Sequence, residues 1–171
     1  MKRSDIVGYI LLFLGLIALQ VIVLNNLDLG AYIKPQILVL FILLLPIDIN
    51  KSYLLLLAFI AGLTVDFLMN TNGLNTSGML LVAFIRGLWL PKENNPRPEF
   101  NVVPSLKIKL NGKWMSYILL LTTIFHFNYF VLEFFNFKYI FRIFTVTILS
   151  TIFCIFVQWI IFKLFLQAKN R

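Results

Sequence analysis

The sequence has little charge, one cysteine and one histidine. Charged residues occupy 13% of its 171 positions, about half the share of a typical soluble domain. The single cysteine, Cys154, cannot form a disulfide within the chain, and the single histidine, His126, excludes a site of several histidines. The phosphate-binding motif G-x-x-x-x-G-K-[ST] and the nucleophile motif G-x-S-x-G are also missing. We therefore expect no enzyme, with no catalytic residue, metal or cofactor.

What the sequence does contain is hydrophobic residues, at 60% of its positions. A soluble domain of about 150 residues buries only about 70% of the surface that its unfolded chain exposes, so this much apolar surface could not be hidden from water. The formal net charge of +8 would suggest nucleic acid in a soluble protein. Here most basic residues lie between and beyond apolar runs, where they orient a membrane protein. We therefore predict contact with membrane lipid and not with nucleic acid.

Six apolar runs approach the ~20 residues that a helix needs to cross a bilayer. They cover residues 6–24, 33–47, 53–69, 74–90, 114–132 and 140–166. We predict an all-α fold, in which residues 1–171 form one integral membrane domain, a polytopic bundle of about six transmembrane helices. The first run lacks the small-residue cleavage site of a signal peptide, and more spans follow it directly.

The distribution of basic residues predicts the orientation of this bundle. With the N-terminus in the cytoplasm, only Lys34, Lys138 and Arg142 of the fifteen Lys and Arg residues lie outside. The positive-inside rule then places both termini in the cytoplasm, in an inner (cytoplasmic) membrane. The longest connection, 91–113, becomes a cytoplasmic loop whose four prolines exclude a long helix. Its end, over 102–112, alternates apolar and basic residues, as a short strand or a segment on the lipid surface would.

The third run carries a carboxylate inside the predicted membrane. Ala58, Gly62, Asp66 and Asn70 are spaced four residues apart, so they share one face of a helix. The small residues allow a neighbouring backbone to approach closely. We expect this face to point into the bundle, which would shield Asp66 from lipid.

Depth along antiparallel helices indicates which residues Asp66 meets. It falls near the level of Ser77, His126 and Tyr129, whereas Arg86 lies about 14 Å deeper at ~1.5 Å per residue. We therefore expect an outer polar cluster of Asp66, Ser77, His126 and Tyr129, either as a device that holds helices together or as a place that captures a ligand. Arg86 should extend to the inner membrane interface by snorkelling.

The sixth run carries a polar stripe. We expect this stripe to be a helix-packing seam, in which Cys154 has no basic partner to activate it as a nucleophile. The stripe consists of Thr147, Ser150, Thr151, Cys154 and Gln158.

Several segments together are similar to a known family. Residues 58–68 read AFIAGLTVDFL and are followed by NGLN at 72–75 and LVAFIR at 81–86. Earlier in the chain, LQVIVLNN at 19–26 precedes IKPQ at 33–36 and LP at 45–46. In order and spacing this pattern resembles the rod shape-determining protein MreD family. The similarity covers most of the first ninety residues, whereas the second half agrees only in hydropathy and length.

The resemblance implies a non-catalytic membrane scaffold of the bacterial cell-elongation complex, which determines cell shape through peptidoglycan synthesis. The implied partner is an MreC-like bitopic protein and, through it, MreB, RodA and a class B penicillin-binding transpeptidase. We expect the partner's transmembrane helix to contact lipid-exposed helix faces and the short connection over 70–77.

Two alternatives remain open. The membrane-embedded substrate-binding subunits of vitamin transporters are six-span bundles of similar size, and the polar cluster could line their pocket. Those subunits typically show an Ala-x-x-x-Ala face in the first span, where this chain has only Gly8, Gly15 and Ala18 as small residues. A secondary transporter would need a charge relay and an inverted repeat, and the sequence shows neither.

Overall fold

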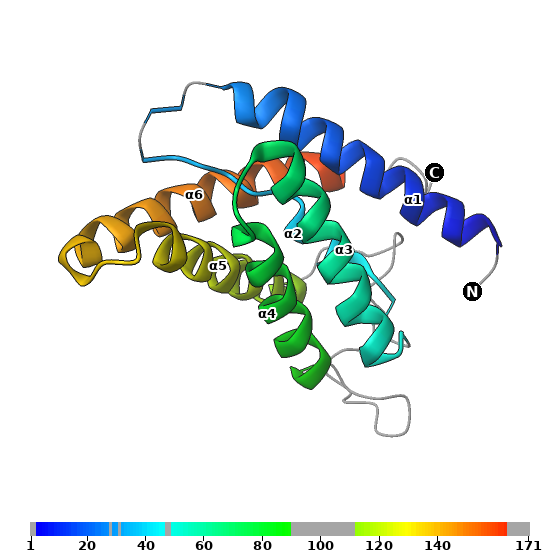
Figure 1. The fold of residues 1–171 in the computed structure, drawn as a ribbon. Helices are drawn as coiled ribbons and strands as arrows, with labels where there is room; N and C mark the ends of the chain where they lie inside the picture. The colour runs from blue at the N-terminus through cyan, green and yellow to red at the C-terminus, as the bar shows by residue number, and fades with distance from the viewer. Residues whose placement is uncertain (1–2, 28, 31, 47–48, 90–111, 164–171) are drawn as a thin grey trace.

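The computed structural model describes residues 3–27, 29–30, 32–46, 49–89 and 112–163. Its α-helices, shown in Figure 1, are α1 (Arg3–Ala18), α2 (Val39–Leu44), α3 (Lys51–Met69), α4 (Leu74–Trp89), α5 (Gly112–Phe134) and α6 (Ile140–Ile161). A π-helical turn, η1 (Leu19–Val23), and a 3-10 turn, η2 (Leu24–Asn26), extend α1, and a 3-10 turn, η4 (Phe137–Tyr139), precedes α6. The described residues therefore confirm the predicted all-α fold.

Four helical stretches are long and apolar enough to cross a membrane. They are Ile6–Asn26, Lys51–Met69, Trp114–Phe134 and Ile140–Ile161, and the chain is therefore a multi-pass membrane protein. A further apolar helix, Leu74–Leu88, is shorter. The predicted cytoplasmic loop falls almost entirely outside the described residues, which resume with α5 at Gly112.

Two helical hairpins form the frame of the structure. α3 packs along α4, α5 packs along α6, and α4 lies against α5 to join the two pairs. α1 lies beside α2, on one side of the bundle (Figure 1). Asn50 caps the start of α3, because its Oδ1 accepts a hydrogen bond from Ser52 N at 3.1 Å. Asn70, in the left-handed conformation, caps the other end.

The prediction of a continuous helix over 33–47 is wrong. Only Val39–Leu44 is α-helical there, and residues 33–36 have no regular secondary structure. Two prolines explain the difference, because Pro35 lacks an N–H and disfavours helical backbone at Lys34, while Pro46 stops the helix on its other side. We call residues 32–46 the central segment.

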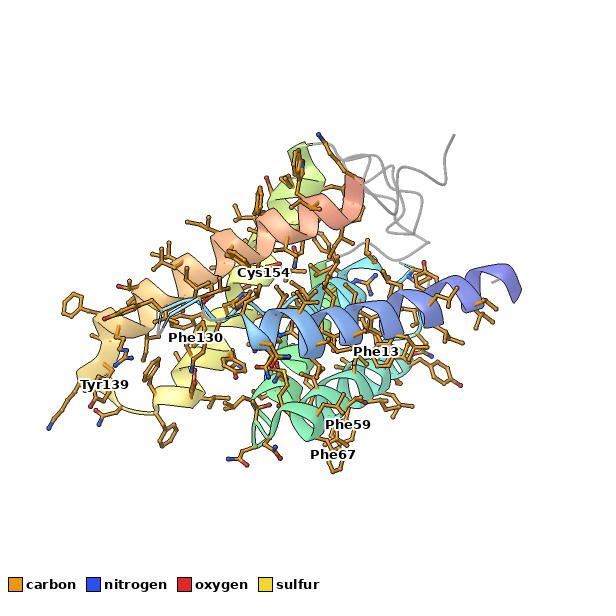
Figure 2. The ribbon with its side chains drawn as sticks, turned by 90° about the horizontal axis from the view of Figure 1, so that it is seen from above. Phe13, Phe59, Phe67, Phe130, Tyr139 and Cys154 are labelled. Atoms are coloured by element: carbon orange, nitrogen blue, oxygen red, sulfur yellow. The ribbon has the colours of Figure 1, made fainter. Side chains whose placement is uncertain are left out.

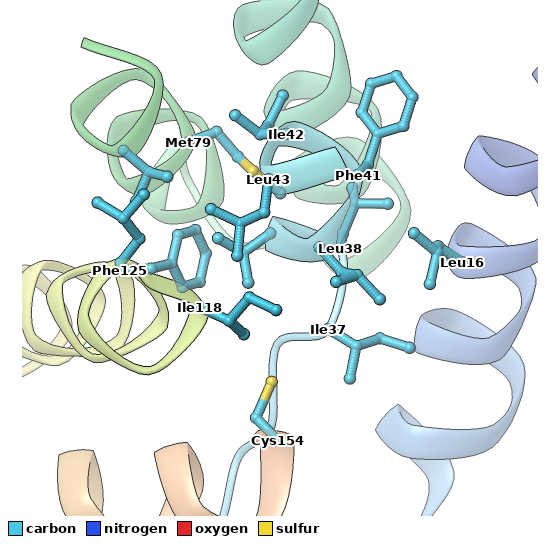
Figure 3. Close-up of a cluster of buried hydrophobic side chains, with 14 of the residues drawn as sticks. Leu16, Ile37, Leu38, Phe41, Ile42, Leu43, Met79, Ile118, Phe125 and Cys154 are labelled. Atoms are coloured by element: carbon cyan, nitrogen blue, oxygen red, sulfur yellow. The ribbon is translucent and has the colours of Figure 1, made fainter. Parts of the chain in front are cut away.

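The central segment lies in the middle of the bundle. Each residue from Ile37 to Leu45 is at most 6% exposed. Figure 3 shows its side chains among those of Leu16 on α1, Met79 on α4 and Phe125 on α5. A helix that is apolar on every side, as α2 is, needs such an environment.

The outward surface of the bundle is strongly apolar. Phe67 on α3 and Phe141 on α6 are 83% and 85% exposed, and the side chains of Phe59 and Phe67 point away from the neighbouring helices (Figure 2). Contiguous exposed apolar surface is uncommon on soluble monomers. Lipid contact is the environment that this surface fits.

Candidate functional site

The central segment has non-helical backbone inside the bundle, and polar side chains from the surrounding helices bind it. Gln20 of η1 binds two backbone groups: its Nε2 donates to Pro35 O at 3.0 Å, and its Oε1 accepts from Ile37 N at 2.7 Å. Gln20 itself is 1% exposed. Non-helical backbone at membrane depth is tolerated only where protein surrounds and pairs it. The Gln20 amide thus replaces hydrogen bonds that a continuous helix would have supplied.

His126 of α5 binds the same stretch from another side. Its Nε2 accepts a hydrogen bond from Gln36 N at 3.2 Å. The ring is therefore neutral with its proton on Nδ1, which donates to Thr122 O at 2.9 Å. Because His126 is fully buried, its role in the structure is to pair one backbone N–H of the central segment.

The polar stripe of α6 faces the central segment. Ser150 Oγ accepts from Lys34 N at 2.9 Å, and Cys154 Sγ donates to Gln36 O at 3.3 Å. Gln158 Nε2 donates to Cys154 Sγ at 3.4 Å. The other two members of the stripe, Thr147 and Thr151, are also buried. The stripe is thus a packing seam that also binds backbone.

Arg86 binds the other end of the central segment. Its Nη2 donates to the carbonyl oxygens of Leu45 and, at 3.2 Å, Pro46, while its Nε donates to Tyr117 Oη at 3.1 Å. The side chain is 1% exposed, so the expected snorkelling to the membrane interface is wrong. A planar guanidinium can bind several acceptors at once, and here these acceptors are carbonyls that lack helical partners.

The central segment follows α5 from end to end. Its Lys34 forms an ion pair with Glu133, near the C-terminal end of α5, while Leu45 meets Arg86 beside Tyr117, near the N-terminal end. Glu133 lies sixteen positions after Tyr117 on α5, which corresponds to ~24 Å at ~1.5 Å per residue. The central segment, which is non-helical over 33–36 and helical only over Val39–Leu44, therefore extends over most of the thickness of a hydrocarbon core.

Asp66 caps the start of α4. Its Oδ1 accepts from Asn75 N at 2.9 Å and from Thr71 Oγ1 at 2.5 Å, and its Oδ2 accepts from Thr76 N at 2.8 Å and from Thr76 Oγ1 at 2.6 Å. Asn75 Nδ2 adds a bond of 3.1 Å. The first N–H groups of a helix have no partner within it, and the helix dipole favours a negative charge there. Asp66 thereby locks α3 to α4.

The close approach of α3 and α4 depends on Gly62. A Cβ atom at Gly62 would overlap Thr76 Cα and would lie 2.8 Å from Thr76 N. Ala58 and Asp66, on the same face, are 0% and 6% exposed, which confirms that this face points into the bundle. Asn70, the fourth member of the series, is exposed at the C-cap of α3.

The four residues of the expected polar cluster have separate partners. Asp66 binds the start of α4, as described above, and His126 binds Gln36. Ser77 Oγ accepts from Asn128 Nδ2 at 3.0 Å and donates to Leu74 O at 2.9 Å. Tyr129 is 3% exposed and stacks on Phe125 with ring centroids 6.4 Å apart. No described hydrogen bond joins any two of these four residues to each other.

A cavity of about 300 Å³ lies between η2, the start of the central segment and the ends of α3 and α5. Its walls include Lys34, Gln36, Thr71, Tyr129 and Glu133. Six buried side-chain oxygens of the described residues have no hydrogen-bond partner, and two of them, Gln36 Oε1 and Glu133 Oε2, belong to residues in this wall. At this cavity, residues that bind the backbone of the central segment also border open space.

Sequence reasoning missed three contributors to these contacts. Gln20 stands alone in an apolar run, and an intramembrane polar residue is itself a signal. Asn75 and Thr76 open a helix, where N–H groups require an acceptor. The acceptor, Asp66, lies within ten residues of both. The unpaired N–H groups at the start of α4 were therefore the donors nearest to Asp66 along the chain.

The comparisons with known proteins give no family assignment. No protein-family model, no curated protein and no solved structure matches this chain.

Proposed function

We propose that this protein is a non-catalytic scaffold of the cell-elongation complex in the bacterial inner membrane, as the resemblance to the MreD family implies. The use of its buried polar groups supports the proposal. Gln20, Asp66, Arg86 and His126 all bind backbone groups of their own chain, which rigidifies the bundle. A rigid bundle with an apolar exterior is suited to presenting fixed helix faces to partner helices.

The proposed topology has six crossings with both termini in the cytoplasm. The central segment is the second crossing and α4 is the fourth. Burial inside the protein supports a second crossing that is only partly helical, because the backbone groups on either side of α2 are paired by Gln20, His126 and Arg86. The excess of basic residues on one side supports the orientation.

We propose that the partner's transmembrane helix binds to α1. The single observation that carries the proposal is the exposure of α1. Only 17% of the membrane-spanning window at Ile6–Asn26 is buried, against 33–44% for the other three long spans. Gly15 is exposed, and a Cβ atom there would meet nothing within 4 Å. Glycine in a helix costs about 1 kcal/mol relative to alanine, and no packing against the described residues requires it. A small residue on an open face permits close approach of a second helix.

The test is a mild-detergent pull-down of the tagged protein from its native membrane, with mass spectrometry of what co-purifies. The proposal expects an MreC-like bitopic protein, together with MreB, RodA and a class B penicillin-binding transpeptidase. Gly15→Leu should fold and reach the membrane but lose the bitopic partner. The matched control is Phe67→Leu, at an 83% exposed position on α3, which should keep it. Equal recovery with both variants would remove α1 as the docking helix.

The alternative is the substrate-binding subunit of a vitamin transporter, and one observation favours it. The cavity adjoins non-helical backbone at residues 33–36, and many membrane transporters bind solutes beside interrupted helices. The same pull-down separates the two proposals. Recovery of paired ATPases or of a tightly bound vitamin would support the transporter subunit and count against the scaffold.

A further inference from the structure

The cavity beside the central segment has features of a ligand site that the scaffold role does not use. Its volume of about 300 Å³ is at the lower end of the ~300–1,000 Å³ typical of small-molecule sites. Such sites are usually lined mostly by apolar residues with a few polar groups. This one combines apolar residues such as Leu24, Leu27 and Met69 with a larger polar share: Lys34, Gln36, Thr71, Tyr129 and Glu133. Its size and lining therefore suit a small polar group.

Two buried oxygen atoms on the lining residues lack hydrogen-bond donors. Gln36 is 3% exposed, and its Oε1 has no partner among the described residues. Glu133 binds Lys34 through Oε1, while its buried Oε2 meets no donor in the part of the chain that the structure describes. Leaving a buried acceptor unpaired is unfavourable, so a native protein usually supplies it with a donor. Both vacant positions are acceptors, and the group that completes them must donate.

The charges in the cavity define the ligand further. Lys34 and Glu133 form an ion pair whose side chains are 45% and 23% exposed, so the pair is accessible from the open side. A ligand with an ammonium group could donate to Glu133 while its own anionic group binds Lys34. The exchange leaves the site neutral, which matters because an uncompensated charge in a partly buried site is costly.

We propose that this cavity binds a primary ammonium group held close to an anionic group. That chemistry belongs to small free amino acids and to the headgroup of phosphatidylethanolamine. The two sources share the N–H donors that Gln36 Oε1 and Glu133 Oε2 need. Their N-trimethylated counterparts, glycine betaine and phosphatidylcholine, carry the same charges without those donors.

The test uses cysteine labelling of the purified full-length chain. Asn25 is an exposed residue of η2 in the cavity wall, so Asn25→Cys places a reactive thiol at the site. The native Cys154 is fully buried and does not compete for a polar maleimide. The rate of labelling is measured in detergent with glycine, β-alanine or γ-aminobutyrate, and again with glycine betaine. A second arm compares nanodiscs of phosphatidylethanolamine with nanodiscs of phosphatidylcholine.

Saturable protection by an ammonium probe, but not by glycine betaine, would identify a free solute as the ligand. At ten times the Kd, labelling should slow about tenfold, as simple occupancy requires. Protection that appears only in phosphatidylethanolamine nanodiscs would identify the lipid headgroup. No protection in either arm, or equal protection by the N-trimethylated compounds, would overturn the proposal.

A variant separates binding from a general change in structure. Glu133→Gln in the Asn25→Cys background keeps the size of the side chain but removes the charge that attracts the ammonium, so protection should be lost. Lys138→Gln, at an exposed position beyond the end of α5, is the matched control and should retain it. Protection that survives Glu133→Gln would overturn the assignment of the site. These results do not depend on which proteins co-purify, so the proposal can fail while the scaffold role stands.

Discussion

The side chain of Gln20 binds the backbone of Pro35, fifteen residues later in the chain: its Nε2 donates to the Pro35 carbonyl oxygen at 3.0 Å. The same amide accepts from the N–H of Ile37 at 2.7 Å. One side chain thus pairs one carbonyl and one N–H of backbone that has left the helical conformation. Gln20 lies in a π-helical turn, a geometry frequent at functional positions. This contact ties the end of the first long helix to the middle of the bundle.

Gln20→Leu should strongly destabilise the protein. Leucine fills a similar volume but leaves Pro35 O and Ile37 N unpaired, at about 1–3 kcal/mol for each buried group. The measurement is Tm from intrinsic fluorescence in a mild detergent. Asn26→Leu is the control and should change stability by less than about 0.5 kcal/mol, since the hydrogen bond described for the Asn26 side chain, to Ile22 O, lies at an exposed position. Equal Tm values for the two variants would contradict the role of Gln20 in pairing the backbone of Pro35 and Ile37.

Gly62→Ala should be destabilising although alanine is the better helix former. The added methyl group would overlap Thr76 Cα, and overpacking of this kind costs about 1–3 kcal/mol. Gly62→Leu, which forces the helices further apart, should be worse. Gly15→Ala is the matched control, because its methyl group meets nothing within 4 Å and removes a helix glycine that costs up to about 1 kcal/mol. We expect Tm to fall for the first variant and to hold or rise for the control; a fall of equal size in both would refute the packing role of Gly62.

Spacing along the chain predicted some of the structure well. The four-residue repeat of Ala58, Gly62 and Asp66 identified a buried face, because helical geometry alone places these residues together. Hydropathy located the long spans, because a helix that crosses a bilayer needs ~20 consecutive, mostly apolar residues. It could not show that only Val39–Leu44 of the run at 33–47 is α-helical, since buried helical and buried non-helical stretches are similarly apolar. Pro35 and Pro46 were the available signals there.

The polar contacts were harder to predict, for a physical reason. Rise per residue gives the depth of a side chain in the membrane, but it says little about rotation around the helix axis. Ser77, His126 and Tyr129 were expected near Asp66 by depth, yet Asp66 binds the nearby N–H groups of Asn75 and Thr76. The N–H groups at the start of a helix have no partner within the helix, and Asp66 pairs these nearby groups in place of side chains on other helices. Similarly, Arg86 binds unpaired carbonyls of the central segment, whose presence hydropathy did not indicate.

Asp66→Asn should loosen the α3–α4 hairpin. The neutral amide has one acceptor oxygen in place of two and loses the favourable interaction of a negative charge with the start of α4, so we expect a cost of about 1–3 kcal/mol. Hydrogen exchange is the direct measurement: the amides of Asn75 and Thr76 should exchange faster. Thr64→Val is the control on the same helix, since Thr64 Oγ1 donates only to Ile60 O. Unchanged exchange at the start of α4 in Asp66→Asn would show that the carboxylate is not its cap.

Arg86→Lys should be costly despite conserving the charge. Lysine has a single ammonium group in place of the planar fork, and it cannot bind the carbonyls of Leu45 and Pro46 and the hydroxyl of Tyr117 in the same geometry. Loss of hydrogen bonds to a charged group costs about 1.5–3 kcal/mol. Arg142→Lys is the matched control, because Arg142 is exposed and rests on the rings of Tyr32 and Phe134. Its expected cost is at most about 1 kcal/mol.

A double-mutant cycle distinguishes this specific role of Arg86 from a general sensitivity of the site. Tyr117→Phe removes the acceptor of Arg86 Nε, which lies 3.1 Å away, and leaves the ring packing against Trp114, whose centroid is 5.1 Å away. If the two side chains act together, the double variant should be less destabilised than the sum of the single variants, by about 0.5–3 kcal/mol. Tm in detergent measures all four corners of the cycle. Strict additivity would mean that the hydroxyl does not help to hold the guanidinium, and that the carbonyls of the central segment alone position it.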